Sequence, residues 1–198
     1  LAETILTNVS ELSFRKTAKN VKLMCNQDIS AQGVWNVVQN VGEKIKKIES
    51  RKIELNSKGL LKGEIETPVL FQEPDGVWLS MQRKDKPKGK SKKKELKLAI
   101  SYTGWTLRPG SKHEHIVVDK TVCASFDSVN YFKKLTEATI AEKYNVEESN
   151  TRRGKGDGAK GRKSSCEEQD IHFQLDPFHI SQAILRNVSD KKNQKVLL

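Results

Sequence analysis

Residues 68–79 read Pro-Val-Leu-Phe-Gln-Glu-Pro-Asp-Gly-Val-Trp-Leu, and here the pattern of the chain changes from helical to strand. Two apolar runs, 69–71 and 77–79, flank the carboxylates of Glu73 and Asp75. Residues two apart on a strand point to one face, and carboxylate oxygens are ligands that Mg²⁺ prefers. Pro-Asp-Gly is also a strong turn signal, and we favour a turn at this point.

The residues that follow alternate between strand and helix patterns. We expect further strands at Leu96–Tyr102, at Val117–Phe126, just before Gly156 and at Ile171–Leu175, with helices at Val129–Tyr144 and from about Phe178 to Val188. Three meander strands followed by alternating helices and strands predict an α/β (α+β) fold. In this fold a mixed sheet is flanked by helices.

Residues 1–50 have a helical pattern, broken by a polar turn at residues 25–28. Ser13 and Ser30 are suited to cap the helices on either side of this turn. The second helix has an apolar stripe at helical spacing, formed by Val34, Val38, Val41, Ile45 and Ile48. Two short helices joined by a tight turn predict a helix-turn-helix, and a plain helical hairpin fits the same pattern.

Two carboxamides, Gln32 and Asn36, stand near the start of the second helix. A carboxamide donates and accepts hydrogen bonds at once, so these side chains suit base edges in a major groove. Gly33 between them is unfavourable inside a recognition helix. We therefore divide the chain into a helix-turn-helix region at 1–50, a polar linker at 51–67 and an α/β domain at 68–198.

The chain has 198 residues, of which 36 are Lys or Arg and 25 are Asp or Glu, so its formal net charge is +11. Two segments hold the excess: Arg83–Lys97 has a net charge of +7 and Arg152–Lys163 one of +5, which leaves −1 elsewhere. Two basic segments on a nearly neutral body indicate a polyanionic partner, although each alone could be a solvated loop. The basic residues we select for DNA binding are Lys92, Lys93, Lys94, Arg152 and Arg153.

Other classes of protein fit the sequence poorly. No run of 18 apolar residues and no secretory signal pattern occurs, and the three widely spaced cysteines fit neither a disulfide framework nor a zinc site. We expect no membrane partner and a cytoplasmic location. Residues 156–161 have the glycine spacing of a phosphate-binding loop but lack the Lys-Ser/Thr that must follow. Asp176 with Pro177 has the pattern of a helix N-cap.

Taken in order, seven short motifs resemble the ISLre-type insertion-sequence transposases of bacteria, long classed as an uncharacterised family. The motifs are Ser13–Ala18, Val34–Gln39, Asp75–Val77, the Lys-rich segment, Tyr102–Trp105, Gly156–Ala159 and Leu175–His179. The resemblance covers nearly the whole chain. It implies an RNase H-like catalytic domain and a DDE-type DNA transposase that cleaves and transfers strands with two Mg²⁺ ions.

The resemblance also implies roles for particular residues. Asp75 would be the first catalytic and metal-binding carboxylate and Asp157 the second, while Asp176 and His179 would match a motif that follows the fifth strand of such enzymes. A third acid would lie beyond Leu198, so we expect the catalytic domain to be incomplete at its C-terminus and the chain alone to be nearly inactive. The implied partners are DNA, both transposon ends and target, and a second copy of the chain.

Two other readings stay open. A non-catalytic, truncated DNA-binding protein that recognises transposon ends would share the basic segments and the helical region. A general RNA-binding protein of ribosomal type would leave the motifs around Asp75 and at Leu175–His179 unexplained.

Overall fold

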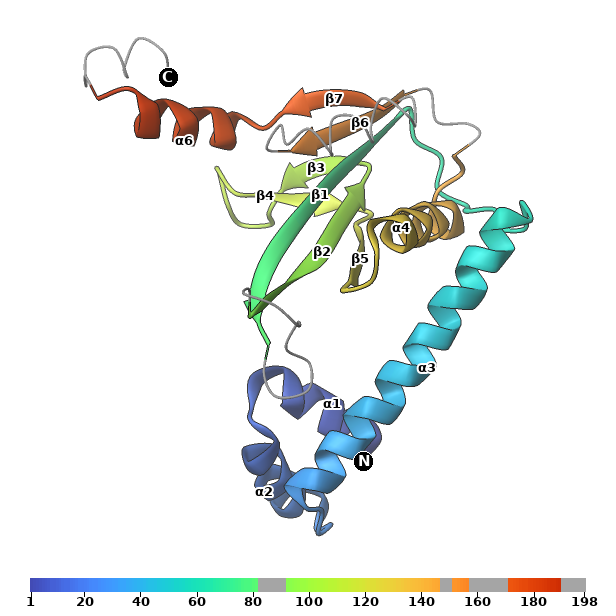
Figure 1. The fold of residues 1–198 in the computed structure, drawn as a ribbon, viewed down its shortest axis with the longest axis vertical. Helices are drawn as coiled ribbons and strands as arrows, with labels where there is room; N and C mark the ends of the chain where they lie inside the picture. The colour runs from blue at the N-terminus through green and yellow to red at the C-terminus, as the bar shows by residue number, and fades with distance from the viewer. Residues whose placement is uncertain (82–91, 147–150, 157–170, 190–198) are drawn as a thin grey trace. The chain divides into compact units, whose positions relative to one another are not determined.

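The computed structural model describes residues 1–81, 92–146, 151–156 and 171–189 (Figure 1). The chain forms two compact units, Leu1–Arg51 and Lys52–Leu198. Within the part of the chain that the structure describes, no helix has the length and apolar character needed to cross a membrane. Each unit is built around its own buried side chains.

The first unit contains α1 (Ala2–Glu11), α2 (Phe14–Cys25) and the first part of α3 (Ala31–Ser57). Each helix contributes one fully buried aliphatic side chain to a shared core, formed by Ile5, Val21 and Val34. Ser13 caps α2 by accepting a hydrogen bond from the Lys16 amide, and Ser30 accepts one from the Gly33 amide at 3.0 Å. Both caps predicted from the sequence are confirmed.

Helix α3 differs from the helix expected at this point. It continues to Ser57, so the first residues of the segment predicted as a linker are helical. Only the beginning of its apolar stripe is buried: Val34 is inaccessible, whereas Ile45 and Ile48 are 50% and 62% exposed. The apolar stripe is therefore buried only at its start, because helical spacing identifies an apolar face without showing what covers it.

The second unit contains a five-stranded mixed sheet with the order β5-β2-β1-β6-β7. Strand β2 runs antiparallel to both of its neighbours, whereas β1, β6 and β7 run parallel. Counted along the chain, this is the third-second-first-fourth-fifth order of an RNase H-like sheet, as expected. The strands are β1 (Val69–Ser80), β2 (Lys93–Tyr102), β5 (Thr121–Ser125), β6 (Thr151–Gly156) and β7 (His172–Leu175).

Strand β1 corrects the turn that we favoured at Pro74-Asp75-Gly76. It continues through all three residues, with Pro74 opposite Ala99 and Asp75 opposite Leu98 of β2. Among the described residues, the ladder with β6 ends at Gln72, so Pro74 lies where β1 pairs with β2 alone. A proline without an N–H donor is tolerated at such a position.

The segment predicted as one strand at Val117–Phe126 is divided between two sheets. Strand β4 (His115–Val118) pairs with β3 (Gly104–Leu107) in a separate two-stranded sheet, and β5 belongs to the main sheet. Between them Asp119 has a φ of 51°, a left-handed conformation that Asp adopts more readily than β-branched residues do. The reversal at Asp119 ends one strand before the other begins.

Helix α4 (Val129–Lys143) covers one face of the main sheet. Its Phe132 and Leu135 pack against Ala99 of β2 and Cys123 of β5, and Ile140 packs with Leu70 of β1. Because α4 connects β5 to β6 across the sheet, it fixes which face of each strand is buried. Helix α6 (Pro177–Asn187) follows β7.

Candidate functional site

The sheet has one face under α4 and an opposite face, which we call the open face. Alternation along β1 points Leu70 and Gln72 toward α4 and places Phe71, Glu73 and Asp75 on the open face. The ring of Phe71 stacks on that of Tyr102, its partner in β2, with centroids 5.3 Å apart. The two carboxylates singled out in the sequence therefore share the open face.

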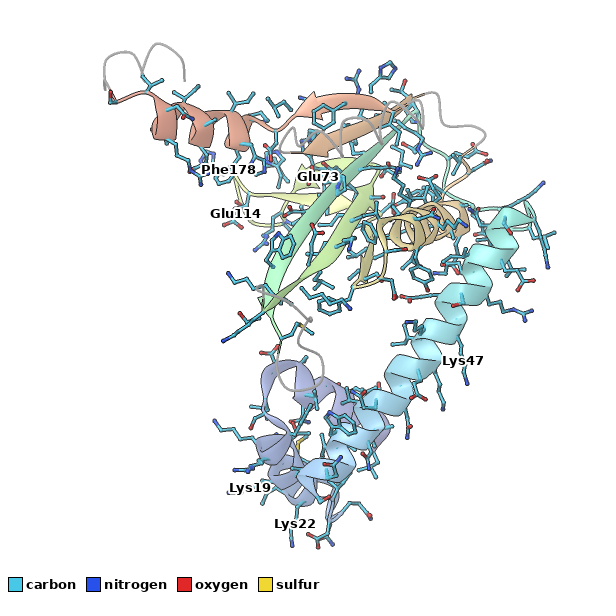
Figure 2. All side chains as sticks on the ribbon, viewed as in Figure 1. Lys19, Lys22, Lys47, Glu73, Glu114 and Phe178 are labelled. Atoms are coloured by element: carbon cyan, nitrogen blue, oxygen red, sulfur yellow. The ribbon has the colours of Figure 1, made fainter. Side chains whose placement is uncertain are left out.

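Glu73 on β1, which is labelled in Figure 2, is contacted by side chains of two neighbouring strands. The Tyr102 hydroxyl donates a 2.7 Å hydrogen bond to the Glu73 carboxylate, and the Lys155 ammonium of β6 lies 3.7 Å from the same oxygen. Burial, and then the hydrogen bond to Glu73, raises the pKa of the Tyr102 hydroxyl well above its ordinary value. Tyr102 therefore remains a proton donor to Glu73 at neutral pH.

Aromatic rings surround the same ammonium. Lys155 Nζ lies 5.3 Å from the centroid of Phe71 and 4.9 Å from that of Trp105 on β3, within cation–π range. Trp105 in turn contacts Phe71, with centroids 5.2 Å apart. We call Phe71, Glu73, Tyr102, Trp105 and Lys155 the Lys155 cluster. It connects three strands of the main sheet to the small β3–β4 sheet.

Asp75 lies two residues beyond Glu73 on β1 and is exposed. One of its carboxylate oxygens accepts a 2.7 Å hydrogen bond from the Gly76 amide. Next to Asp75, a Cβ at position 76 would lie 2.4 Å from a carboxylate oxygen of Glu95. A Cβ at position 76 would thus require the end of the Glu95 side chain to move, and the carboxylate of Asp75 is exposed.

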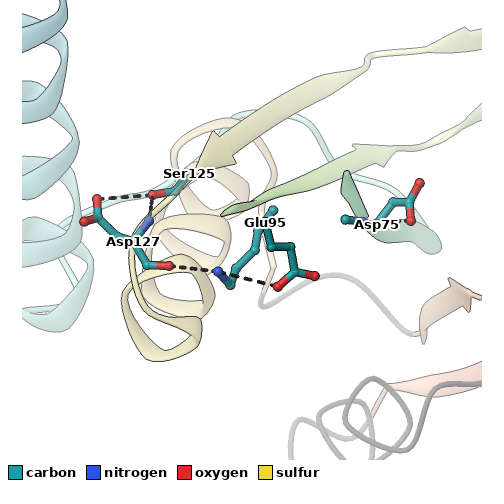
Figure 3. A network of polar contacts seen from close by, with 6 residues as sticks. Asp75, Glu95, Ser125 and Asp127 are labelled. Carbon is teal, nitrogen blue, oxygen red and sulfur yellow. Dashed lines mark hydrogen bonds and ion pairs between the residues drawn. The ribbon is translucent and has the colours of Figure 1, made fainter. Parts of the chain in front are cut away.

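Glu95 belongs to a polar network near the beginning of α4 (Figure 3). The Lys97 ammonium lies 3.8 Å from the Glu95 carboxylate and donates a 3.0 Å hydrogen bond to the Asp127 carbonyl. The Ser125 hydroxyl accepts from the Asp127 amide. These bonds fasten the end of β5 to β2.

Asp157, the second predicted carboxylate, directly follows β6 in the sequence and lies outside the described residues. In the ranges that are described, no three His, Cys, Asp or Glu side chains gather closely enough to hold a metal ion. Asp75 fits such a role as a single hard oxygen ligand. The metal site expected from Asp75 and Asp157 stays a prediction.

Asp176 caps α6, as predicted. Its carboxylate accepts a 3.0 Å hydrogen bond from the Phe178 amide, and Pro177 is the first helical residue. Its own amide donates to the Gly156 carbonyl, the last of β6. The charge of Asp176 adds a small further rise to the pKa of Tyr102. His179 lies in the first turn of α6, where its ring contacts that of Phe178 with centroids 5.5 Å apart.

The two arginines selected for DNA binding lie on opposite faces of β6. Arg152 is level with Leu70, on the α4 side, and its guanidinium donates a 2.7 Å hydrogen bond to Glu137. Arg153 is level with Phe71, on the open face, and is exposed. Lys92, Lys93 and Lys94, at the start of β2, are also exposed. Of the two arginines, only Arg153 shares a face with Asp75.

The carboxamides predicted to contact bases are exposed on the first turns of α3. Gln32 donates a 3.0 Å hydrogen bond to Asn36, one turn later. Gly33 between them has a packing role, because a Cβ there would lie 2.8 Å from the side chain of Ile29. Ile29 packs against the core of the first unit.

Comparison with known proteins places the chain in a family. The model of the Uncharacterised protein family (UPF0236) matches residues 2–196. The chain belongs to this family. No curated protein sequence matches it.

Among solved structures, the UPF0236 chain is similar to one described as "Crystal structure of the Mos1 Strand Transfer Complex". The two share 10% identity and a TM-score of 0.23, over 87% of this chain and 56% of that chain. The chain thus spans just over half the length of that protein.

The sequence did not predict the Lys155 cluster of this UPF0236 protein. Alternation along β1 already placed Glu73 on one face. Its partners Tyr102 and Lys155 are 29 and 82 residues away along the chain, and only the register of β1 with β2 and β6 brings them together. The motif Tyr102-Thr103-Gly104-Trp105 was the available signal, because it holds two of the aromatic rings.

Proposed function

We propose that this chain is part of a DNA transposase that cleaves and transfers strands with divalent metal, using Asp75 and Asp157 as carboxylate ligands. One observation carries the proposal: Asp75 presents an exposed carboxylate on the central strand of an RNase H-like sheet. The neighbouring parallel strand β6 ends at the residue before Asp157. Adjacent parallel strands are suited to supply paired metal ligands.

The chemistry follows from the charges on the open face. Bound Mg²⁺ would activate a water or a 3′-hydroxyl and stabilise the leaving oxygen of a phosphodiester. Arg153, exposed on the same face as Asp75, is suited to hold a phosphate of the strand. Glu73 is a poorer ligand, because its carboxylate already accepts from Tyr102 and pairs with Lys155.

The helical unit would recognise the DNA sequence. Gln32 and Asn36 are exposed one turn apart on α3, where both could contact base edges of one major groove. Selecting bound duplexes from a random pool tests this role. Asn36→Ala should weaken discrimination at one base position, whereas Gln27→Ala, a change to an exposed carboxamide in the α2–α3 turn, should not. Unaltered selection by Asn36→Ala would remove Asn36 from base recognition.

Metal binding by the full chain tests the carboxylates. In a Mn²⁺ titration followed by electron paramagnetic resonance, Asp75→Asn and Asp157→Asn should each weaken binding at least about tenfold, the size expected for losing one ligand or its support. Asp28→Asn, a change to an exposed carboxylate of the helical unit, should have no effect. Wild-type affinity in Asp75→Asn would show that the assignment is wrong.

The same variants separate the two candidate functions on duplex DNA. In a version of the protein lengthened to include the third acid expected beyond Leu198, a transposase should nick labelled duplex in Mg²⁺ or Mn²⁺, and Asp75→Asn should abolish the nicking while DNA binding persists. Tight DNA binding by that version with no nicking in either metal would favour the non-catalytic DNA-binding protein instead.

A further inference from the structure

The indole of Trp105 is held in place and yet half exposed. Phe71 and Tyr102 contact it with centroids 5.2 and 6.2 Å away, at interplanar angles of 56° and 63°. The Lys155 ammonium lies 4.9 Å from its centroid. Despite these contacts 51% of the residue is accessible to solvent. The cluster therefore fixes the ring without covering it.

A fixed and exposed ring differs from a scattered surface hydrophobic residue. Its orientation is set by neighbours from β1, β2 and β6, so little conformational entropy remains to be lost when a second flat ring stacks on it. Contact with the Phe71–Tyr102 ring pair uses only part of the Trp105 indole. The rest of the indole is exposed and is suited to an aromatic partner.

The charges around the ring indicate the kind of partner. Arg153 is exposed on the open face, two residues before Lys155. The Lys155 ammonium neutralises the charge of Glu73, the one carboxylate of the cluster. Cationic side chains beside an accessible aromatic ring are the usual arrangement for binding unpaired nucleotides, whose phosphates contact the cations while the bases stack. Asp75 lies on the same face of β1 as Glu73.

We propose that Trp105 is a stacking platform for an unpaired DNA base close to the strand that carries Asp75, with Arg153 contacting the adjacent phosphate. This inference rests on the proposed function, since it takes DNA as the substrate. A DNA strand that is cut on the open face would be held by one of its bases. This base would stack on Trp105 and would be unstacked from the duplex. Base–aromatic stacking contributes about 1–3 kcal/mol per base, or roughly 5–150-fold in affinity.

Affinity for two related substrates tests the platform. The full chain is titrated with a labelled duplex and with the same duplex bearing a five-nucleotide single-stranded end. Trp105→Ala should lose roughly 5–150-fold in affinity for the second substrate and less than about twofold for the first. Trp105→Phe keeps a ring and should stay within about threefold of wild type on both. Trp78→Ala, which removes another exposed indole (60%) outside the cluster, should leave the ratio of the two affinities unchanged.

Fluorescence gives a readout that does not depend on how Trp105→Ala folds. In the variant Trp35→Phe/Trp78→Phe, Trp105 is the only indole left. The single-stranded end should quench its emission, and replacing the unpaired nucleotides by abasic sites should abolish the quenching. Absence of quenching on a substrate that binds would overturn the platform.

The outcomes distinguish this inference from the function beneath it. Equal losses on both substrates in Trp105→Ala, or no loss on either, would overturn the platform while DNA binding stands. A wild-type chain that binds neither substrate would overturn both.

Discussion

A single hydroxyl connects three segments of the second unit. Tyr144 is fully buried, and its hydroxyl contacts the carbonyl oxygens of Ser101, at 2.9 Å, and Asp119. Burial, followed by the charge of Asp119, raises its pKa to about 12. The folded state therefore favours the protonated hydroxyl. Its contribution to stability is complete below pH 10, the ordinary value, and is lost as the pH rises through about 12.

Tyr144→Phe should lower the free energy of unfolding by about 1–3 kcal/mol at pH 8, because two carbonyl groups lose a buried donor. The loss of stability above pH 10 should also become shallower. Tyr131→Phe is the matched control: its buried hydroxyl has no partner among the described residues, so removing it should be neutral or stabilising. Urea unfolding at pH 8 and pH 11 measures both effects. Equal costs for the two variants would contradict this account.

Two glycines should respond to alanine with opposite signs. A Cβ at Gly63 would lie 2.2 Å from the backbone nitrogen of Tyr144, so Gly63→Ala should destabilise the second unit by about 1–3 kcal/mol. A Cβ at Gly42, inside α3, would meet nothing within 4 Å, so Gly42→Ala should stabilise the helix by about 0.5–1 kcal/mol. Thermal unfolding followed by circular dichroism should show opposite shifts, and shifts of one sign would be inconsistent with these contacts.

What the sequence predicted at the residue scale were local interactions. Ser13, Ser30 and Asp176 bond to amides two or three residues away, so neighbouring letters were enough to identify them as caps. Gly63 is required by the backbone around Tyr144, and Gly76 lies against the side chain of Glu95. Their contacts depend on register and packing, which adjacent residues do not encode.

At the scale of elements, β1 shows tertiary pairing overriding a local signal. Pro74-Asp75-Gly76 is a strong turn sequence, yet ten consecutive residues from Phe71 to Ser80 pair with β2. The ladder supplies backbone partners that a turn at this point would forfeit. Strand β7 and helices α4 and α6 were predicted close to their observed limits, because their patterns agree with their surroundings, whereas β6 was predicted only by its position before Gly156. The exposed Ile45 and Ile48 of α3 show that a correctly predicted helix does not reveal which part of its apolar stripe is buried.

Strand β6 gives an element-scale prediction through two adjacent arginines. The ion pair of Arg152 with Glu137 is largely buried, with the side chains 15% and 28% exposed, so Arg152→Ala should cost about 1.5–3 kcal/mol of stability. Under conditions in which the Arg152→Ala variant is folded, its affinity for DNA should stay nearly unchanged. Arg153→Ala on the open face should instead keep stability within about 0.5 kcal/mol and weaken DNA binding. Urea unfolding measures the stability of each variant, and fluorescence anisotropy measures its DNA affinity. If Arg152→Ala weakened DNA binding and Arg153→Ala did not, the α4 side of the sheet would be the face that contacts DNA.

At the scale of the whole molecule, charge is the property that composition predicts best. The net charge of +11 comes from two segments, and the described ends of both are exposed: Lys92–Lys94 at the start of β2 and Arg153 on β6. Helix α4 lies on the other face of the sheet and carries its own lysines, Lys133 and Lys134. Composition counts these groups alike, whereas the fold places the exposed Arg153 and the lysines of α4 on different faces of the sheet.

Salt dependence turns this distribution into a measurement. If the basic segments neutralise about six phosphates, log K for duplex DNA should fall with log salt at a slope of roughly −5, because each neutralised phosphate releases about 0.9 of a counterion. Lys93→Gln/Lys94→Gln should make the slope shallower by about 2. Lys133→Gln/Lys134→Gln removes the same charge from α4 and should leave the slope nearly unchanged, since these lysines lie outside the two basic segments. Equal changes in both double variants would mean that net charge alone attracts DNA, and a flat salt dependence in the wild type would remove DNA as the partner.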